Sequence, residues 1–267
     1  MLEPLPAVQP PIRPDRGFAR HLPATAALSW LAAGWADFRH NPLQSLIYGL
    51  ASFALSVLVI WGLVVADLLW LIFPALSGFL VIGPLVAIGL YEKSRKLQRG
   101  EKVSLADMLL VRPRSGAQLA FAGLMLCLLV MVWLRAADLL YALFFGLLPF
   151  PGFDHILNQL LTTPRGWALI LTGSAVGGLF AAFAMAISLF SIPMLLDRRT
   201  DALTALGTSF ALTTHNLRVV LPWGMIVALG FAMCAVTGLL SMIVIFPLLG
   251  HGTWHAWVAL RPEELAE

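Results

Sequence analysis

Long apolar stretches alternate along this chain with short segments that hold nearly all of its basic residues. Of 17 Lys and Arg residues, only Arg135 and Arg165 fall outside four segments. These segments are residues 1–40, 91–118, 197–218 and the C-terminal tail. About 20 apolar residues suffice for a helix to cross a bilayer, and basic residues concentrate in loops that stay in the cytoplasm. The pattern therefore predicts a multi-pass membrane protein with both termini in the cytoplasm.

The composition excludes a water-soluble globule. Hydrophobic residues make up 60% of the chain and charged residues 12%, whereas soluble domains carry about 25% charged residues. The net charge of +3 follows from the basic loops, and no basic stretch is interleaved with stacking aromatics, so nucleic acid is not an expected partner. Cys127 and Cys234 both lie inside apolar runs, where they are expected to be core residues and not a disulfide.

The apolar stretches predict an all-α bundle of six membrane-spanning helices. We expect residues 1–22, rich in Pro, to be a disordered cytoplasmic tail, 23–261 to be the six-helix domain, and 262–267 to be a second cytoplasmic tail. The expected spans are 43–66, 68–91, 118–141, 167–196, and two within 219–260 separated by an outer turn near 237–241.

Short helical segments at the cytoplasmic interface precede each pair of spans. These segments are 25–40, 103–110 and 200–215, and Ser104 with Asp107 has the spacing of a helix N-cap in the second. The second span of each pair contains a proline, namely Pro84, Pro193 or Pro247. The arrangement suggests three repeats of an interfacial helix and a hairpin. The alternative is that membrane helices in general tolerate Pro.

Two histidines in the last span are the best candidates for chemistry. His251 and His255 are four positions apart, which places both imidazoles on one helical face. Imidazoles at this spacing can bind a metal ion or haem iron. No Glu beside them supplies the general base of a zinc hydrolase. Hydrogen bonding between helices or at the interface is the other interpretation.

A second polar group is expected at the outer side of the membrane. Arg135 and Asp138 are three positions apart and can pair on one face of the third span. With Asp67, Asp154 and His155 they could line a polar pathway for protons or cations.

On the inner side, the basic residues after the second span are expected to contact anionic lipid headgroups. They are Lys93, Arg95, Lys96 and Arg99. In the fourth span, Gly173 and Gly177 have the spacing of a close helix–helix contact.

Four separated blocks resemble a bacterial family of predicted integral membrane proteins of unknown function. The blocks are WLAAGWADFRHNPLQSLIYGL, GPLVAIGLYEKSRKLQRGE, SIPMLLDRRTDAL and FPLLGHGTWHAW. The resemblance extends over about residues 29–261 and implies a bacterial inner-membrane location, with no established activity. Some members are labelled as resembling cytochrome c oxidase subunit I, but the His-Pro-Glu-Val-Tyr block of such subunits is absent from this sequence.

The leading functional hypothesis is a non-catalytic accessory, assembly or scaffold component of the membrane. The sequence holds no Walker loop, nucleophile elbow or dinucleotide fingerprint, so no catalytic residue and no definite cofactor are predicted. The alternatives are a small-solute or ion transporter or channel, and a haem- or metal-binding redox protein that uses His251 and His255. The expected partners are the bilayer, its anionic headgroups and a second membrane protein.

Overall fold

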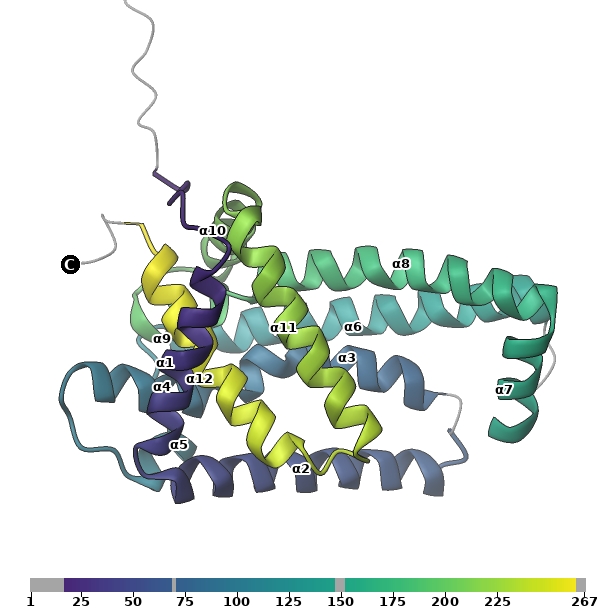
Figure 1. Cartoon of the computed structure of the whole chain (residues 1–267), viewed down its shortest axis with the longest axis horizontal. Coiled ribbons are helices and arrows are strands. Elements are labelled where there is room, and N and C mark those ends of the chain that lie inside the picture. Colours follow the sequence, from purple (N-terminus) through teal and green to yellow (C-terminus); the bar gives the residue numbers. More distant parts are fainter. Residues whose placement is uncertain (1–16, 69–70, 147–151, 263–267) are drawn as a thin grey trace, which may run out of the picture.

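The fold is a bundle of α-helices (Figure 1). The computed structural model describes residues 17–68, 71–146 and 152–262. The helices of this part are α1 (Ala26–Arg39), α2 (Pro42–Val65), α3 (Ile72–Val86), α4 (Ile88–Gln98), α5 (Leu105–Leu109), α6 (Gly116–Phe145), α7 (Phe153–Thr162), α8 (Pro164–Ser188), α9 (Ser191–Asp197), α10 (Ala202–His215), α11 (Leu217–Val236) and α12 (Met242–Leu260).

Six helical stretches of the described chain are long and apolar enough to cross a membrane. They are Pro42–Val65, Ala75–Gln98, Gly116–Phe145, Pro164–Asp197, Leu217–Val236 and Met242–Leu260. The prediction of an all-α bundle with six spans is thus confirmed. The turn predicted between the last two spans also lies where expected, since α11 ends at Val236 and α12 begins at Met242.

The second and fourth spans are each broken near a proline. α3 ends at Val86, two residues after Pro84, and α8 ends shortly before Pro193 in α9. Proline lacks an N–H and crowds the preceding turn, so it interrupts the helical hydrogen-bond ladder. Hydroxyl groups from neighbouring helices satisfy groups freed by the breaks, as a membrane interior requires. The Tyr48 hydroxyl donates to the Val86 carbonyl at 2.6 Å, and Ser209 Oγ accepts from the Phe190 N–H at 3.0 Å.

The short helices lie mainly at one end of the bundle, which we call the basic end. It consists of α1, α4, α5, α9, α10 and the C-terminal half of α12, at the left of Figure 1, whereas α7 lies at the right. Both described ends of the chain meet here. Asn216 Nδ2 donates to the Phe18 carbonyl at 2.6 Å, and the Arg20 guanidinium donates to the Arg261 carbonyl at 2.7 Å.

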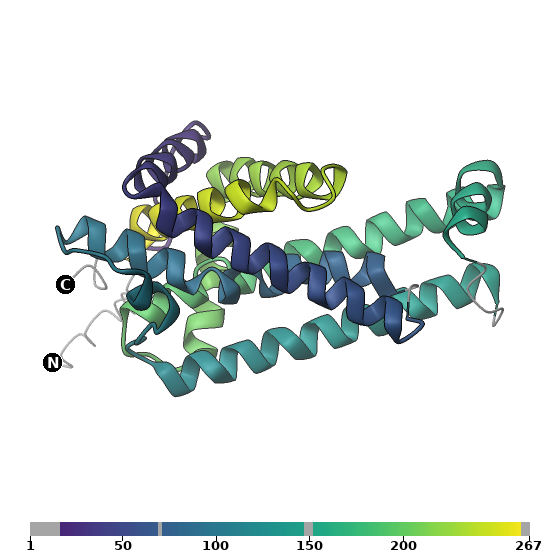
Figure 2. The ribbon, with the colours of Figure 1, turned by 90° about the horizontal axis from the view of Figure 1, so that it is seen from below.

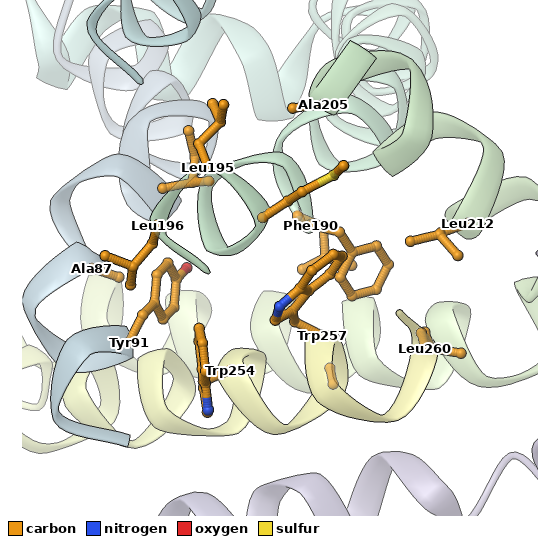
Figure 3. Packing of buried hydrophobic residues seen from close by; sticks show 14 of the residues in the cluster. Ala87, Tyr91, Phe190, Leu195, Leu196, Ala205, Leu212, Trp254, Trp257 and Leu260 are labelled. Atoms are coloured by element: carbon orange, nitrogen blue, oxygen red, sulfur yellow. The ribbon is translucent and has the colours of Figure 1, made fainter. Parts of the chain in front are cut away.

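The most completely buried apolar residues fill the basic end. Tyr91 of α4, Phe190 and Leu196 beside and within α9, and Trp254 and Trp257 of α12 each have at most 2% of their surface exposed. Figure 3 shows these side chains converging between the three helices. The second arms of the three hairpins therefore pack together at this end.

The short helices cover this core in a regular order. α5 packs on α4, α10 packs on α9, and α1 packs on α12. Each short helix thus contacts the second arm of the hairpin before it, with α1 closing the ring on the last hairpin. This order agrees with three related hairpins, and their origin as repeats stays a prediction.

Glycines allow α1 and α2 to approach α12 closely. A Cβ atom at Gly34 of α1 would lie 2.6 Å from the backbone nitrogen of Gly252, and one at Gly49 of α2 would collide with the carbonyl of Ile243. Such contacts between backbones are how small residues hold membrane helices together. They bring polar side chains of α1 and α2 against the histidines of α12.

Candidate functional site

A group of polar side chains from four helices, all but one of them buried or half-buried, lies at the basic end, and we call it the polar cluster. Its members are Asp37 of α1, Ser45 of α2, Lys93, Ser94 and Gln98 of α4, and His251 and His255 of α12. Ser45, Lys93, Ser94 and His251 have no exposed surface. An unpaired polar group is costly at such a position, so the pairing of these groups decides whether the arrangement is stable.

His251 is held through both ring nitrogens. Nε2 lies 3.0 Å from Ser45 Oγ, and Nδ1 lies 2.8 Å from Ser94 Oγ. The Lys93 ammonium donates to Ser45 Oγ at 2.9 Å and to the Asn41 carbonyl at 3.1 Å. Because an ammonium group can only donate, the Ser45 hydroxyl uses its own proton toward His251 Nε2. Nδ1 of His251 then carries the ring proton and donates to Ser94.

The chain of hydrogen bonds continues to Asp37. The carboxylate of Asp37 accepts a hydrogen bond from His255 Nε2 at 2.8 Å, and the Ser94 hydroxyl is near enough to help lower its pKa. Burial by itself raises the pKa of Asp37, but these interactions outweigh it and hold the pKa below its ordinary value. Asp37 is therefore a carboxylate at neutral pH. All donors in the chain point from the Lys93 ammonium toward this anion.

The second histidine is also fixed by partners on two helices. Gln98 Nε2 lies 3.3 Å from His255 Nδ1, and Gln98 Oε1 accepts from the Trp254 indole N–H at 3.0 Å. Since the Gln98 amide donates to Nδ1, the other nitrogen of His255 donates to Asp37. The cluster thus fixes the orientation of both imidazoles.

His251 and His255 lie on one face of α12, as predicted, and both contact α4. The sequence did not identify their hydrogen-bond partners. Asp37 is 218 positions from His255, and Ser45 is 206 positions from His251. One signal was present in the sequence, namely that Asp37 is the only charged residue of segment 25–38. Among the described residues, no three His, Cys, Asp or Glu side chains are placed to share a metal ion. The metal or haem site stays a prediction, and it would require a ligand to replace one of these hydrogen bonds.

The basic residues expected at lipid headgroups turn largely toward the protein. Lys93 is fully buried and Arg95 is 8% exposed, with Arg95 donating to the Leu196 carbonyl at 2.9 Å and pairing with Glu92 at 2.6 Å. The structure therefore directs these two inward, because α4 is covered by α5, α9 and α12. Lys96 and Arg99 are partly exposed.

Lys96 and Arg99 also have acidic partners. Lys96 binds Asp107 at 2.9 Å, and Asp107 forms the predicted N-cap of α5 with Ser104, in a reciprocal capping box. Hydrogen bonds from Lys96 and Ser104 lower the pKa of Asp107 to about 2. Arg99 lies 3.4 Å from Asp197. These pairs attach α5 and α9 to α4.

At the α7 end, the predicted pair between Arg135 and Asp138 is present at 3.3 Å, with the Arg135 side chain 83% exposed. Asp67 and His155 are exposed, and the side chain of Asp154 lies outside the described part. Among described side chains, no hydrogen bond or ion pair connects Asp67 or His155 with the pair, so the polar pathway stays a prediction.

The two glycines predicted to form a close helix contact differ in their surroundings. Gly177 packs against the Trp133 ring of α6, where a Cβ atom would lie 2.9 Å from it, whereas no atom lies within 4 Å of a Cβ atom at Gly173. Only Gly177 therefore makes the predicted contact within the described chain.

The fold and the apolar helices together define a polytopic α-helical integral membrane protein. Residues 72–197 match the model of a family described as "Predicted integral membrane protein (DUF2189)". This match confirms the predicted resemblance over the segment from α3 to α9. The segment includes Lys93, Ser94 and Gln98 of the polar cluster. No curated protein and no solved structure matches the chain significantly.

Proposed function

We propose that this chain is a non-catalytic accessory, assembly or scaffold component of the bacterial inner membrane, with both termini cytoplasmic. The observation that carries the proposal is the pairing of His251, which uses both ring nitrogens on Ser45 and Ser94 while fully buried. A substrate site presents polar groups to the space that the substrate fills. In the polar cluster these groups bind one another and join α1, α2, α4 and α12.

The partner surface of this scaffold is its apolar exterior together with the basic end. Partly exposed Lys96 and Arg99 add attraction to anionic headgroups, at about 1 kcal/mol for each basic residue near the surface. A second membrane protein would pack on the apolar faces of the spans, where side chains such as Leu179 and Leu229 are exposed by 72% and 68%.

Cysteine labelling tests the proposal. Ser45→Cys and Ser94→Cys are made singly in a background that carries Cys127→Ala and Cys234→Ala, and the folded protein is exposed to a membrane-impermeant maleimide. We expect no labelling until the protein is denatured, because both positions are fully buried. Lys102→Cys, at an exposed position, is the matched control that reacts at once. Native labelling of either buried position at the rate of the control would contradict a dry structural cluster.

A transporter is the second candidate, and the two helix breaks favour it. The breaks after α3 and α8 occupy corresponding arms of successive hairpins, and interrupted helices in related units often build substrate sites. The ionisable Lys93 follows the first break closely. A transporter requires the cluster to open to water, so labelling of Ser94→Cys that responds to a membrane potential or pH gradient would support it.

Spectroscopy distinguishes a redox protein from the scaffold and the transporter. A haem or metal protein would show a Soret band or stoichiometric metal that disappears in His251→Ala/His255→Ala. A colourless and metal-free wild-type protein would exclude this candidate.

A further inference from the structure

A groove of about 430 Å³ opens on the side of the bundle between α2 and α6. Figure 2 shows α2 running between the α11–α12 hairpin and α6, and the groove lies where α2 faces α6. Its walls include Tyr48, Ala51 and Leu55 of α2, Met108 of α5, and Leu119 of α6. The walls are predominantly apolar, as a site for a hydrocarbon chain requires.

The break in the second span borders this groove, because Val86 and Ile88 on either side of the break are among its lining residues. The Tyr48 hydroxyl bridges the break, donating to the Val86 carbonyl at 2.6 Å and accepting from the Gly89 N–H at 3.3 Å. Gly89 also leaves no room for a Cβ atom against the carbonyl of Met108, so α5 lies tightly on α4.

Two exposed arginines lie in the sequence beside residues that line the groove. Arg112 and Arg114 alternate in sequence with the lining residues Val111 and Pro113, and both are exposed. Within the described chain neither guanidinium has a hydrogen bond or an ion pair. In this they differ from Arg95 and Arg99, which bind acids of the protein.

The residues before these arginines have the character expected at the surface of a hydrocarbon layer. Leu109 and Leu110 are exposed by 59% and 76%, directly before Arg112. Apolar side chains beside exposed cations are typical of helices that lie at the boundary between acyl chains and headgroups. An apolar groove with unpaired cations beside it matches a lipid with an anionic headgroup.

We propose that this groove binds an anionic phospholipid, with one acyl chain between α2 and α6 and the phosphate on Arg112 and Arg114. The proposal goes beyond the scaffold function and does not depend on it. A guanidinium group matches phosphate geometry and can bind it through two parallel hydrogen bonds. Each arginine near the surface is expected to strengthen binding about five-fold, so the pair should favour an anionic over a zwitterionic lipid by about 25-fold.

Native mass spectrometry of the detergent-purified chain, titrated with dioleoyl phosphatidylglycerol or dioleoyl phosphatidylcholine, tests this site. We expect preferential binding of phosphatidylglycerol, lost about 25-fold in Arg112→Gln/Arg114→Gln. Arg135→Gln/Arg165→Gln removes the same charge elsewhere and should retain the preference. If the first double variant keeps the wild-type preference, the assignment of the phosphate to these arginines is wrong.

A second pair of variants tests the acyl chain. Ala51→Phe fills the groove and should weaken both lipids, while Ala175→Phe, at an exposed position of α8, should leave both unchanged. Unaltered lipid binding by Ala51→Phe would overturn the groove as the acyl site. Both substitutions are at exposed positions, and thermal unfolding of each variant checks that the substitution leaves the fold intact.

Discussion

The Nε2 atom of His255 lies 2.8 Å from Oδ2 of Asp37, and this contact joins the last helix of the described chain to the first. The same carboxylate is linked through Ser94 and His251 to Ser45. A short series of side-chain contacts therefore connects α1, α2 and α4 with α12 at the other end of the described chain. Contacts of this kind constrain the whole basic end and not one hairpin.

Substitution of Asp37 should destabilise the protein in a pH-dependent way. Because folding lowers the pKa of Asp37 from 3.8, its contribution is complete above that value and is lost as pH falls through the lower, folded-state pKa. We expect Asp37→Asn to reduce the free energy of unfolding by about 1–3 kcal/mol at pH 7. The difference from wild type should narrow below about pH 4.

Tryptophan-fluorescence melting in detergent between pH 7 and pH 3 measures this difference. Asp67→Asn, at an exposed aspartate, is the control and should match wild type throughout. A deficit in Asp37→Asn that stays constant across the range would show that the ionised carboxylate does not carry the effect.

Glycine-to-alanine substitutions in α2 should have opposite effects at two positions. At Gly49 the new Cβ atom would meet the Ile243 carbonyl, while at Gly62 it would meet nothing within 4 Å. Gly49→Ala should destabilise by about 1–3 kcal/mol through overpacking. Gly62→Ala should stabilise by about 0.5–1 kcal/mol, because alanine loses less backbone entropy in a helix. Chemical or thermal unfolding of both variants checks the sign, and equal effects would contradict the close crossing of α2 and α12.

Hydropathy and helical period predicted the spans and the common face of His251 and His255, because both are local properties of the chain. The partners of these histidines follow instead from which helices cross, and the sequence does not encode that crossing locally. Gly49 and Gly173 illustrate the limit, since both are glycines in apolar helices and only Gly49 touches another backbone. Lys93 shows the same limit for predictions made from charge. The positive-inside rule predicts its side of the membrane, but burial by neighbouring helices decides that it binds Ser45 and not lipid.

Asp197, at the end of α9, should contribute strongly to the stability of the fold. Its carboxylate is 7% exposed and lies 3.3–3.7 Å from the guanidinium groups of Arg99, Arg198 and Arg261. Asp197→Asn leaves these cations without their shared anion, and we expect a loss of about 3 kcal/mol of stability. Asp201→Asn removes one charge at an exposed helix cap four residues later and should cost about 1 kcal/mol or less. Unfolding in denaturant compares the two, and an equal loss would contradict a special role for Asp197.

The orientation of the chain follows from the charge at its two ends and can be tested directly. The basic end holds most Lys and Arg residues, whereas the α7 end holds Arg135 and Arg165. Basic residues in short loops resist translocation, so the basic end should face the cytoplasm. A green fluorescent reporter fused after Gly100 should fluoresce, and alkaline phosphatase fused after Thr163 should be active. The reciprocal fusions are the controls and should be silent. Active phosphatase after Gly100 would reverse the orientation and move the arginines at the lipid groove to the outer leaflet.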